Sequence, residues 1–112
     1  MSLQKITDSN FEDFIKNKKA VLFLTLSYCP YCQAYKKEIM SVIKANPAVK
    51  FGCADVEEGN TNKLEATIAM PDYYPTAILF KNGKEILRLE SGAGDPTTCD
   101  EFEDVIKKNF FL

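Results

Sequence analysis

The chain contains neither histidine nor tryptophan. Without histidine it can form no Ser–His or Cys–His catalytic pair and no histidine-ligated metal site. Its charges nearly cancel, because 14 Lys and Arg residues stand against 16 Asp and Glu residues, for a formal net charge of -2. This mildly acidic balance disfavours nucleic acid and anionic membranes as partners, since both attract a clustered positive surface. The four cysteines are therefore the first residues to consider for chemistry.

Long apolar runs are absent as well. The longest extends from Ala20 to Leu24 and continues past Thr25 to Leu26, far short of the roughly twenty residues of a membrane span. The beginning of the chain has no apolar stretch of the kind found in a secretory signal. We expect a soluble, cytoplasmic protein, and 112 residues are enough for one domain with a core of its own.

The spacing of apolar residues predicts alternating strands and helices. Ala20–Leu26 is almost entirely apolar, which suits an inner strand of a parallel sheet that is buried on both faces. Asn82-Gly83 between two apolar runs is a strong hairpin signal and predicts an antiparallel pair of strands. We therefore expect a mixed sheet with helices on both faces.

The boundaries of these elements follow from caps, turns and prolines. Strands are expected at Leu3–Ile6, Ala20–Leu26, Val49–Val56, Thr76–Phe80 and Glu85–Leu89, the last with Ile86 on one face and Leu87 and Leu89 on the other. Three helices are expected: one after a capping box at Ser9–Glu12, one from Pro30 to the stop at Asn46-Pro47, and one over Thr61–Ala69. A fourth and last helix is expected to begin at Asp95-Pro96 or within Thr98–Glu101. Its apolar stripe consists of Phe102, Val105, Ile106 and Phe110.

The motif Cys29-Pro30-Tyr31-Cys32 lies where the buried strand meets the start of a helix. A thiolate at Cys29 can accept the unpaired N–H groups of the first helical turn there, and the helix dipole favours its negative charge. Cys32 lies one turn later, close enough to attack a mixed disulfide that has formed on Cys29. The motif therefore predicts Cys29 as the attacking thiol and Cys32 as the resolving thiol.

The other two cysteines, Cys53 and Cys99, stand alone in the sequence. A zinc site of four cysteines needs a second closely spaced pair, so we expect no bound metal. Cys53 falls in a predicted inner strand, where a free cysteine is commonly a small core residue. Cys99 lies near the start of a helix and is a candidate for regulatory oxidation, although a weaker candidate for thiol chemistry than Cys29 and Cys32.

Taken together, these features resemble the thioredoxin-like superfamily. The likeness covers nearly the whole chain: the Cys-x-x-Cys motif after an inner strand is followed by Tyr74-Pro75-Thr76 and then by Phe80–Lys84 in the hairpin. The resemblance implies an α/β thioredoxin fold, with a central mixed sheet of four to five strands flanked by helices on both faces. It also implies a single thioredoxin-like domain over residues 1–112.

The resemblance assigns roles to residues around the motif. Pro75 matches the family's cis-proline, which faces the active-site disulfide, and Tyr74 matches the residue whose backbone pairs with bound substrate. Gly92 resembles the glycine that lets a substrate chain approach. Tyrosine rings near the motif would add an apolar surface with polar tips for extended protein substrates. The predicted substrate-binding residues are Tyr28, Pro30, Tyr31, Tyr74, Pro75 and Gly92.

Several positions of the chain depart from the thioredoxin pattern, among them Tyr28 in place of a tryptophan and Lys37 in place of a proline that kinks the long helix. Pro30-Tyr31 at the centre of the motif resembles glutaredoxins, whereas thioredoxins usually carry Gly-Pro there. Phe23 stands where thioredoxins usually have a buried aspartate, and Cys53 aligns with the lysine that partners it on the next inner strand. That aspartate is thought to help move a proton at the resolving cysteine, so Cys32 would need water or another group for this step.

Three hypotheses of function follow. The first is a monomeric thiol–disulfide oxidoreductase for disulfide-bearing proteins, which needs no metal or organic cofactor and takes its electrons from a flavoprotein reductase or from glutathione. The second is a glutaredoxin-like enzyme that removes glutathione from proteins, with glutathione as co-substrate. The third is a non-catalytic module, either a thioredoxin-fold adaptor or an iron–sulfur carrier that uses Cys29 together with glutathione.

Overall fold

The computed structural model describes residues 3–26, 30–57, 60–71, 74, 76–90 and 99–111, without the side chains of residues 30–36, 38, 90 and 99–101. Strands and helices alternate through most of the chain, as the apolar spacing predicts. In chain order the elements are β1 (Gln4–Lys5), α1 (Phe11–Ile15), β2 (Ala20–Thr25), α2 (Pro30–Ala45), β3 (Lys50–Asp55), α3 (Asn62–Thr67), β4 (Thr76–Lys81), β5 (Lys84–Glu90) and α4 (Cys99–Phe110).

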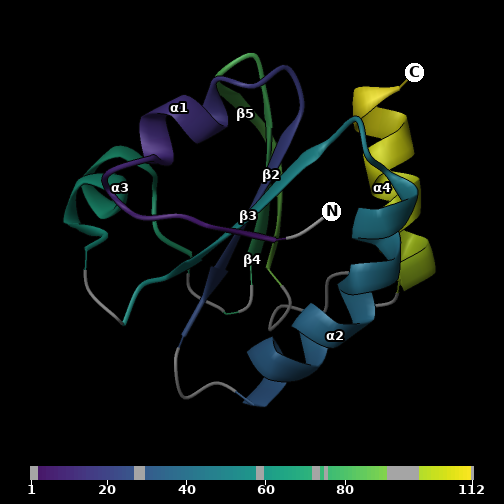
Figure 1. Ribbon diagram of the computed structural model, residues 1–112, viewed down its shortest axis with the longest axis horizontal. Coiled ribbons are helices and arrows are strands. Elements are labelled where there is room, and N and C mark those ends of the chain that lie inside the picture. The colour runs from purple at the N-terminus through teal and green to yellow at the C-terminus, as the bar shows by residue number, and fades with distance from the viewer. Residues whose placement is uncertain are drawn as a thin grey trace.

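The five described strands form one mixed sheet in the order β1-β3-β2-β4-β5. β1 and β2 run parallel to β3, whereas β4 runs antiparallel to both β2 and β5. The unit β3–α3–β4 therefore does not add a parallel neighbour, because β4 pairs with β2 in the opposite direction. Helices cover both faces of the sheet (Figure 1), and the predicted fold class is confirmed.

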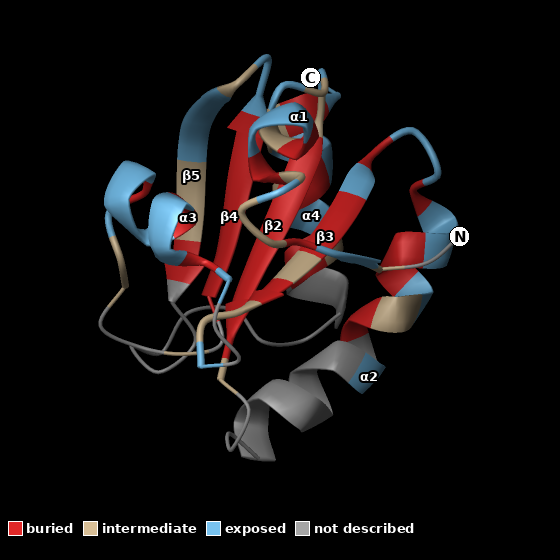
Figure 2. Ribbon diagram, turned by 60° about the vertical axis from the view of Figure 1, so that its left-hand side comes forward, coloured by how far each residue is buried: buried red, intermediate tan, exposed pale blue. Residues whose placement is uncertain are grey.

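The central strand β2 is buried along its whole length (Figure 2). Val21 and Phe23 point to the face covered by α2 and α4, and they pack in the apolar core between the sheet and those helices. Leu22 and Leu24 point to the opposite face and pack in the core beneath α1 and α3. Because both faces are covered, an all-apolar strand without alternation is what this position requires.

The turn between β4 and β5 follows the Asn-Gly prediction. Asn82 and Gly83 both have positive φ angles, 54° and 88°, which is the backbone of a two-residue hairpin turn that matches the twist of the strands. After the turn, Leu87 and Leu89 lie opposite Leu79 and Ala77 on the α2 and α4 side, while Ile86 is 40% exposed. The prediction that Leu87 and Leu89 share one face of β5 is confirmed.

The predicted capping box at Ser9–Glu12 is wrong. α1 begins at Phe11 after Asn10, and no side chain caps it at this position. The Oδ1 atom of Asn10 accepts a hydrogen bond from the Thr7 N–H at 2.8 Å, so a local turn takes up the polar side chain that would otherwise cap the helix. Glu12 instead forms an ion pair with Lys63 of α3 at 2.9 Å, and the hydrogen bond in that pair lowers the pKa of the Glu12 carboxyl.

Asp8 caps α3 from a distant part of the chain. Its carboxylate oxygens accept hydrogen bonds from the backbone N–H groups of Lys63 and Leu64, at 3.1 and 2.9 Å. The Asp8 N–H in turn donates to the carbonyl of Asn60 at 2.7 Å. These bonds satisfy donors that the first turn of a helix leaves unpaired. α3 itself spans Asn62–Thr67 and is shorter than predicted.

The last helix, α4, begins at Cys99, and the other predicted starting points upstream lie outside the described residues. Phe102, Ile106 and Phe110 are buried, and Val105 packs against the same core, so the predicted apolar stripe is confirmed. None of the helices in the described ranges combines the length and the apolar composition that a membrane crossing needs.

Gly52 of β3 packs closely against the side chains of Ile6 and Phe14. A Cβ atom at Gly52 would lie 2.6 Å from Cγ1 of Ile6 and 2.8 Å from Cζ of Phe14. We expect Gly52→Ala to lower the free energy of unfolding by about 1–3 kcal/mol, the usual cost of overpacking a core, measured by urea denaturation. Ile6→Ala removes one obstructing side chain, so the double variant should lose less than the sum of the single losses. Strictly additive losses would contradict the steric explanation.

Candidate functional site

Three segments that carry predicted site residues leave the sheet at the same end. Leu24, near the end of β2, pairs with Thr76 at the start of β4. Thr76 also pairs with Glu90 at the end of β5. The end of β2, the start of β4 and the end of β5 therefore lie side by side, and the first turn of α2 is at this end of the molecule as well (Figure 1).

Each predicted site residue adjoins one of these three ends in the sequence. α2 begins at Pro30, so Cys29 directly precedes the helix and Cys32 belongs to its first turn. Tyr74 is half-buried, packs against the core beneath α1 and α3, and comes two residues before β4. Outside the described part of the chain lie Tyr28, Cys29, Pro75 and Gly92, together with the side chains of Pro30, Tyr31 and Cys32. The roles of these residues stay predictions.

Phe23 and Cys53 are paired across β2 and β3, as the alignment of these two positions with the thioredoxin pattern implied. Phe23 is fully buried, and its ring stacks on Phe51 with the ring centroids 6.3 Å apart. It also contacts Phe102 in a tilted arrangement at 5.7 Å between centroids. An aromatic ring thus fills the position that the resemblance gives to a carboxylate, and this position can neither accept nor donate a proton.

Cys53 is a free thiol that is only partly buried. It packs against the edge of the core formed with α2 and α4. Its sulfur lies 3.4 Å from the hydroxyl oxygen of Thr25, the last residue of β2. Cys53 packs against the core, as predicted for a small core residue, but its side chain is only partly buried. The side chain of Cys99, at the start of α4, lies outside the described residues.

A β-bulge gives β5 a feature that sequence reasoning missed. Leu79 pairs with Leu87, but the next residue of β4, Phe80, pairs with Glu85. Residues three apart in a regular strand point to opposite faces, and the extra residue in the bulge brings Glu85 and Arg88 to the same face. The sequence carries no signal for this register shift, so the pairing of Glu85 with Arg88 was not predictable.

Arg88 uses this position to bridge two parts of the chain. Its Nε and Nη2 atoms donate to the two carboxylate oxygens of Glu85, at 2.7 and 2.8 Å. Its Nη1 atom donates to the backbone carbonyl of Ala69 at 2.8 Å. Ala69 follows α3 and begins the segment that leads to Tyr74, so Arg88 holds the start of the segment for which a substrate-binding role is predicted.

The family model of thioredoxin matches residues 2–108, which is nearly the whole chain. The chain therefore belongs to the thioredoxin family. This membership supports a thiol–disulfide oxidoreductase as its general kind of function. No curated protein matches the chain in sequence.

Solved structures share the fold over almost their full lengths. The oxidised form of mitochondrial thioredoxin 3 from Saccharomyces cerevisiae is 25% identical, with a TM-score of 0.77 over 95% of this chain and 94% of that chain. Thioredoxin from Plasmodium falciparum is 17% identical, with a TM-score of 0.79 over 96% and 99%. Thioredoxin f2 from Chlamydomonas reinhardtii is 15% identical, with a TM-score of 0.79 over 96% and 95%.

The aromatic contacts of Phe23 predict that a carboxylate cannot simply be restored at this position. Phe23→Asp removes the ring and leaves a buried charge without a cation opposite, because the paired residue is Cys53. We expect a loss in the free energy of unfolding greater than the about 3–5 kcal/mol typical of Phe→Ala. Phe23→Leu keeps an apolar side chain and should lose clearly less in the same urea denaturation experiment. Equal stability of the two variants would contradict the expected cost of burying a carboxylate at this position.

The contacts of Arg88 predict a local effect on the segment after α3. Arg88→Lys keeps the charge but loses the two-pronged bond to Glu85, so we expect a loss of about 1–2 kcal/mol in the free energy of unfolding. Amide hydrogen exchange in the segment from Ala69 to Tyr74 should accelerate more than exchange in β2. Glu85→Gln leaves the bond to the Ala69 carbonyl in place and is the matched control. Exchange that is equally fast in both variants would contradict a role for the Ala69 bond.

Proposed function

We propose that the protein exchanges disulfides with protein substrates through Cys29 and Cys32. The Cys29 thiolate attacks one sulfur of a substrate disulfide, which forms a mixed disulfide and releases the other substrate sulfur as a thiolate that takes up a proton. Cys32, as a thiolate, then attacks the Cys29 sulfur, and the second substrate sulfur leaves. The substrate gains two electrons, and the protein is left with a disulfide between Cys29 and Cys32.

The observation that carries this proposal is the pairing of β2, β4 and β5 with one another at one end of the sheet. It brings the strand end before the cysteine motif next to the strand start after Tyr74-Pro75. α2 starts directly after Cys29 in the sequence, and an N-terminal helix end favours a thiolate through its dipole and its unpaired N–H groups. Membership of the thioredoxin family supports the same chemistry.

Substrate recognition is proposed for the residues around the motif. The backbone of Tyr74 would pair with an extended substrate segment, Pro75 would orient it toward the cysteines, and Gly92 would leave room for its chain. Tyr28 and Tyr31 would add aromatic contact area with polar tips. Such a surface suits protein disulfides better than small molecules, because it recognises backbone and apolar side chains.

The Cys32 thiol must lose its proton before it attacks the mixed disulfide. The aspartate that is thought to help with this step in the family is absent from this chain. Phe23 occupies the aspartate position and is enclosed by Phe51 and Phe102. We propose that water, or another group near the motif, removes this proton. The slow step of the cycle should then be resolution by Cys32 rather than attack by Cys29.

The electron donor is proposed to be a flavoprotein reductase or glutathione. The match of the thioredoxin family model over residues 2–108 favours a reductase of the thioredoxin type. Pro30-Tyr31 at the centre of the motif favours glutathione, because it resembles glutaredoxins. The second candidate function, removal of glutathione from proteins, depends on this one observation.

The first experiment is a titration of the Cys29–Cys32 pair against glutathione buffers. We expect a disulfide to form, with a reduction potential between about -270 mV, the value of thioredoxin, and about -200 mV, the upper end for glutaredoxins. A value close to the first favours a reductase as donor, and one near about -200 to -230 mV favours glutathione. If the pair formed no disulfide at any ratio of the buffer, the catalytic proposal would be wrong.

Cysteine variants separate the candidate activities. Cys29→Ser should abolish the reduction of insulin disulfides, Cys32→Ser should trap a mixed disulfide, and Cys53→Ser should act as the unchanged control. Removal of glutathione from a protein by Cys32→Ser would favour the glutaredoxin-like activity, because that reaction needs only Cys29. Absorbance above 300 nm in freshly purified protein would reveal an iron–sulfur cluster and favour the carrier hypothesis.

A further inference from the structure

The end of the sheet opposite the cysteine motif carries a cluster of lysines, here called the lysine pole. It consists of three short segments: residues 16–19 between α1 and β2, Lys50 at the start of β3, and residues 81–84 at the turn between β4 and β5. None of these segments contains an acidic residue. The lysines of the pole are Lys16, Lys18, Lys19, Lys50, Lys81 and Lys84.

Backbone contacts hold the three segments together. The carbonyl of Lys18 accepts a hydrogen bond from the Asn82 N–H at 3.3 Å, and the carbonyl of Lys19 accepts one from the Lys50 N–H at 3.0 Å. Ala20, the first residue of β2, pairs with Lys50 on one side and with Phe80 on the other. The loop before β2, the start of β3 and the turn of the hairpin thus lie side by side at the top of the molecule (Figure 1).

Among the residues that the structure describes, neighbouring carboxylates offset the charge of the pole only in part: the pKa of the Glu12 carboxyl is lowered mainly by Lys63 but also by Lys16 of the pole. Five of the six lysines are exposed and Lys19 is half-buried, and within the described part of the chain none of the six forms an ion pair. Lys81 and Lys84 lie directly opposite each other across the hairpin, an arrangement of like charges that costs stability. The nearest carboxylates in sequence are Asp13 and Glu85, and Glu85 is taken up by Arg88.

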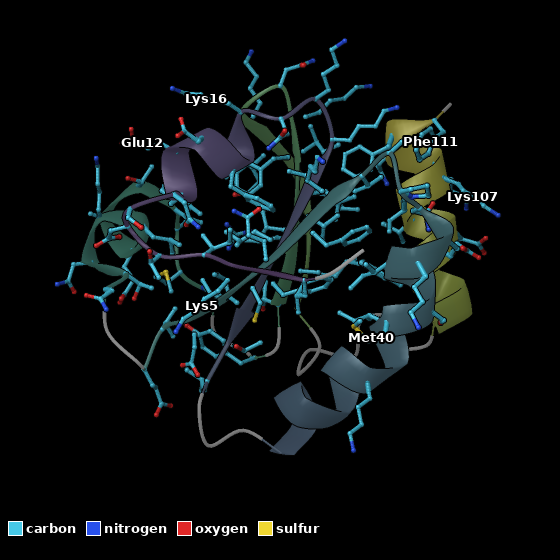
Figure 3. All side chains as sticks on the ribbon, in the orientation of Figure 1. Lys5, Glu12, Lys16, Met40, Lys107 and Phe111 are labelled. Atoms are coloured by element: carbon cyan, nitrogen blue, oxygen red, sulfur yellow. The ribbon has the colours of Figure 1, made fainter. Side chains whose placement is uncertain are left out.

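One exposed aromatic ring adjoins the pole. Phe111 is 45% exposed and follows α4, and the ammonium group of Lys19 lies 4.1 Å from the centre of its ring. Figure 3 shows Lys16 and Phe111 in the upper part of the molecule. The pole therefore combines strongly hydrated cations on protruding turns with an apolar ring beside them.

We propose that the lysine pole binds the surface of a membrane that contains anionic lipids. Clusters of four to eight basic residues are attracted to anionic lipids, at about 1 kcal/mol for each lysine near the surface. Several protruding turns can touch a flat surface at once, and the ring of Phe111 can enter the interface between headgroups and acyl chains. The expectation of no membrane partner depended on the net charge, which does not show that the fold gathers these lysines at one end.

Nucleic acid fits the pole less well. Proteins that bind single strands offer several aromatic rings on which bases stack, whereas the described residues of the pole adjoin one ring. Base edges of a duplex are read mainly by a helix or a β-ribbon in the major groove, with arginine as the commonest reader, whereas the pole presents turns and lysines. The membrane proposal accounts for all of these features.

The orientation that follows leaves the cysteine motif accessible. β2 begins at Ala20, directly after the pole segment 16–19, and ends at Thr25, next to the strand ends that adjoin the motif. Five steps along a strand separate these two residues by about 17 Å. A protein held by its lysine pole would therefore present the opposite end to the solvent. Membrane binding and disulfide exchange would then use separate surfaces and can be tested separately.

The test is cosedimentation of the protein with lipid vesicles. Binding is expected with phosphatidylcholine vesicles that contain about 30% phosphatidylserine, but not with phosphatidylcholine alone, and it should be lost when salt shortens the range of charge interactions. The variant Lys18→Glu/Lys84→Glu should bind at least about 30-fold more weakly, the loss expected for two lysines at about 1 kcal/mol each. The control Lys5→Glu/Lys37→Glu changes the net charge equally away from the pole and should lose much less.

Several outcomes would overturn the proposal. They are equal binding to both kinds of vesicle, absence of binding to either, equal losses in the two variants, or binding to single-stranded RNA or polyglutamate without binding to anionic vesicles. The lipid and salt series of the unaltered protein tests the proposal even if a variant fails to fold. Insulin reduction by Lys18→Glu/Lys84→Glu should remain unchanged, so failure of the membrane proposal is distinguishable from failure of the catalytic one.

Discussion

The burial of β2 on both faces is the constraint on which the other elements depend. Val21 and Phe23 require an apolar layer on one side, and Leu22 and Leu24 require one on the other, so helices must cover both faces of the sheet. A shift of one residue in the register of β2 would exchange these two sets and disrupt both cores. The ends of β2 are fixed as a result, with the lysine pole at Ala20 and the path toward Cys29 at Thr25.

The same burial explains how this chain differs from the thioredoxin pattern at two paired positions. A carboxylate between Phe51 and Phe102 would need a cation opposite to offset its desolvation. The chain has Phe23 in place of the acid and Cys53 in place of the lysine, and the two are cross-strand partners. Where the resemblance implies an acid and a lysine, this chain thus has an aromatic ring on one strand and a small thiol on the next. The change favours packing over proton transfer.

Features that depend on local spacing could be predicted from the sequence. Asn82-Gly83 turns the hairpin as expected, because its two residues tolerate positive φ, and the apolar stripe of α4 packs as its spacing indicates. Features that depend on distant partners could not. Asp8 caps α3 across the chain, and the bulge in β5 exists only in relation to β4. One local feature also differed from the prediction, because the Asn10 side chain accepts a hydrogen bond from the Thr7 N–H in a turn.

The candidate site was predictable to the same extent. The motif and its order along the chain predict roles for the cysteines and Pro75, and these roles stay predictions, while the link between Arg88 and Ala69 required the register of the sheet. The lysines show that net charge and composition do not predict where charges gather in the fold. α1, α2 and α4 each end near the pole, so lysines at or just after their last turns, such as Lys16, Lys44 and Lys107, lie where helix dipoles are negative. The N-terminal end of α2 lies at the opposite end of the sheet and directly follows Cys29 in the sequence, so its dipole would favour the proposed thiolate. The C-terminal ends of α1, α2 and α4 thus add cations near the pole, although five of its six lysines, Lys18, Lys19, Lys50, Lys81 and Lys84, lie in a loop or at strand ends.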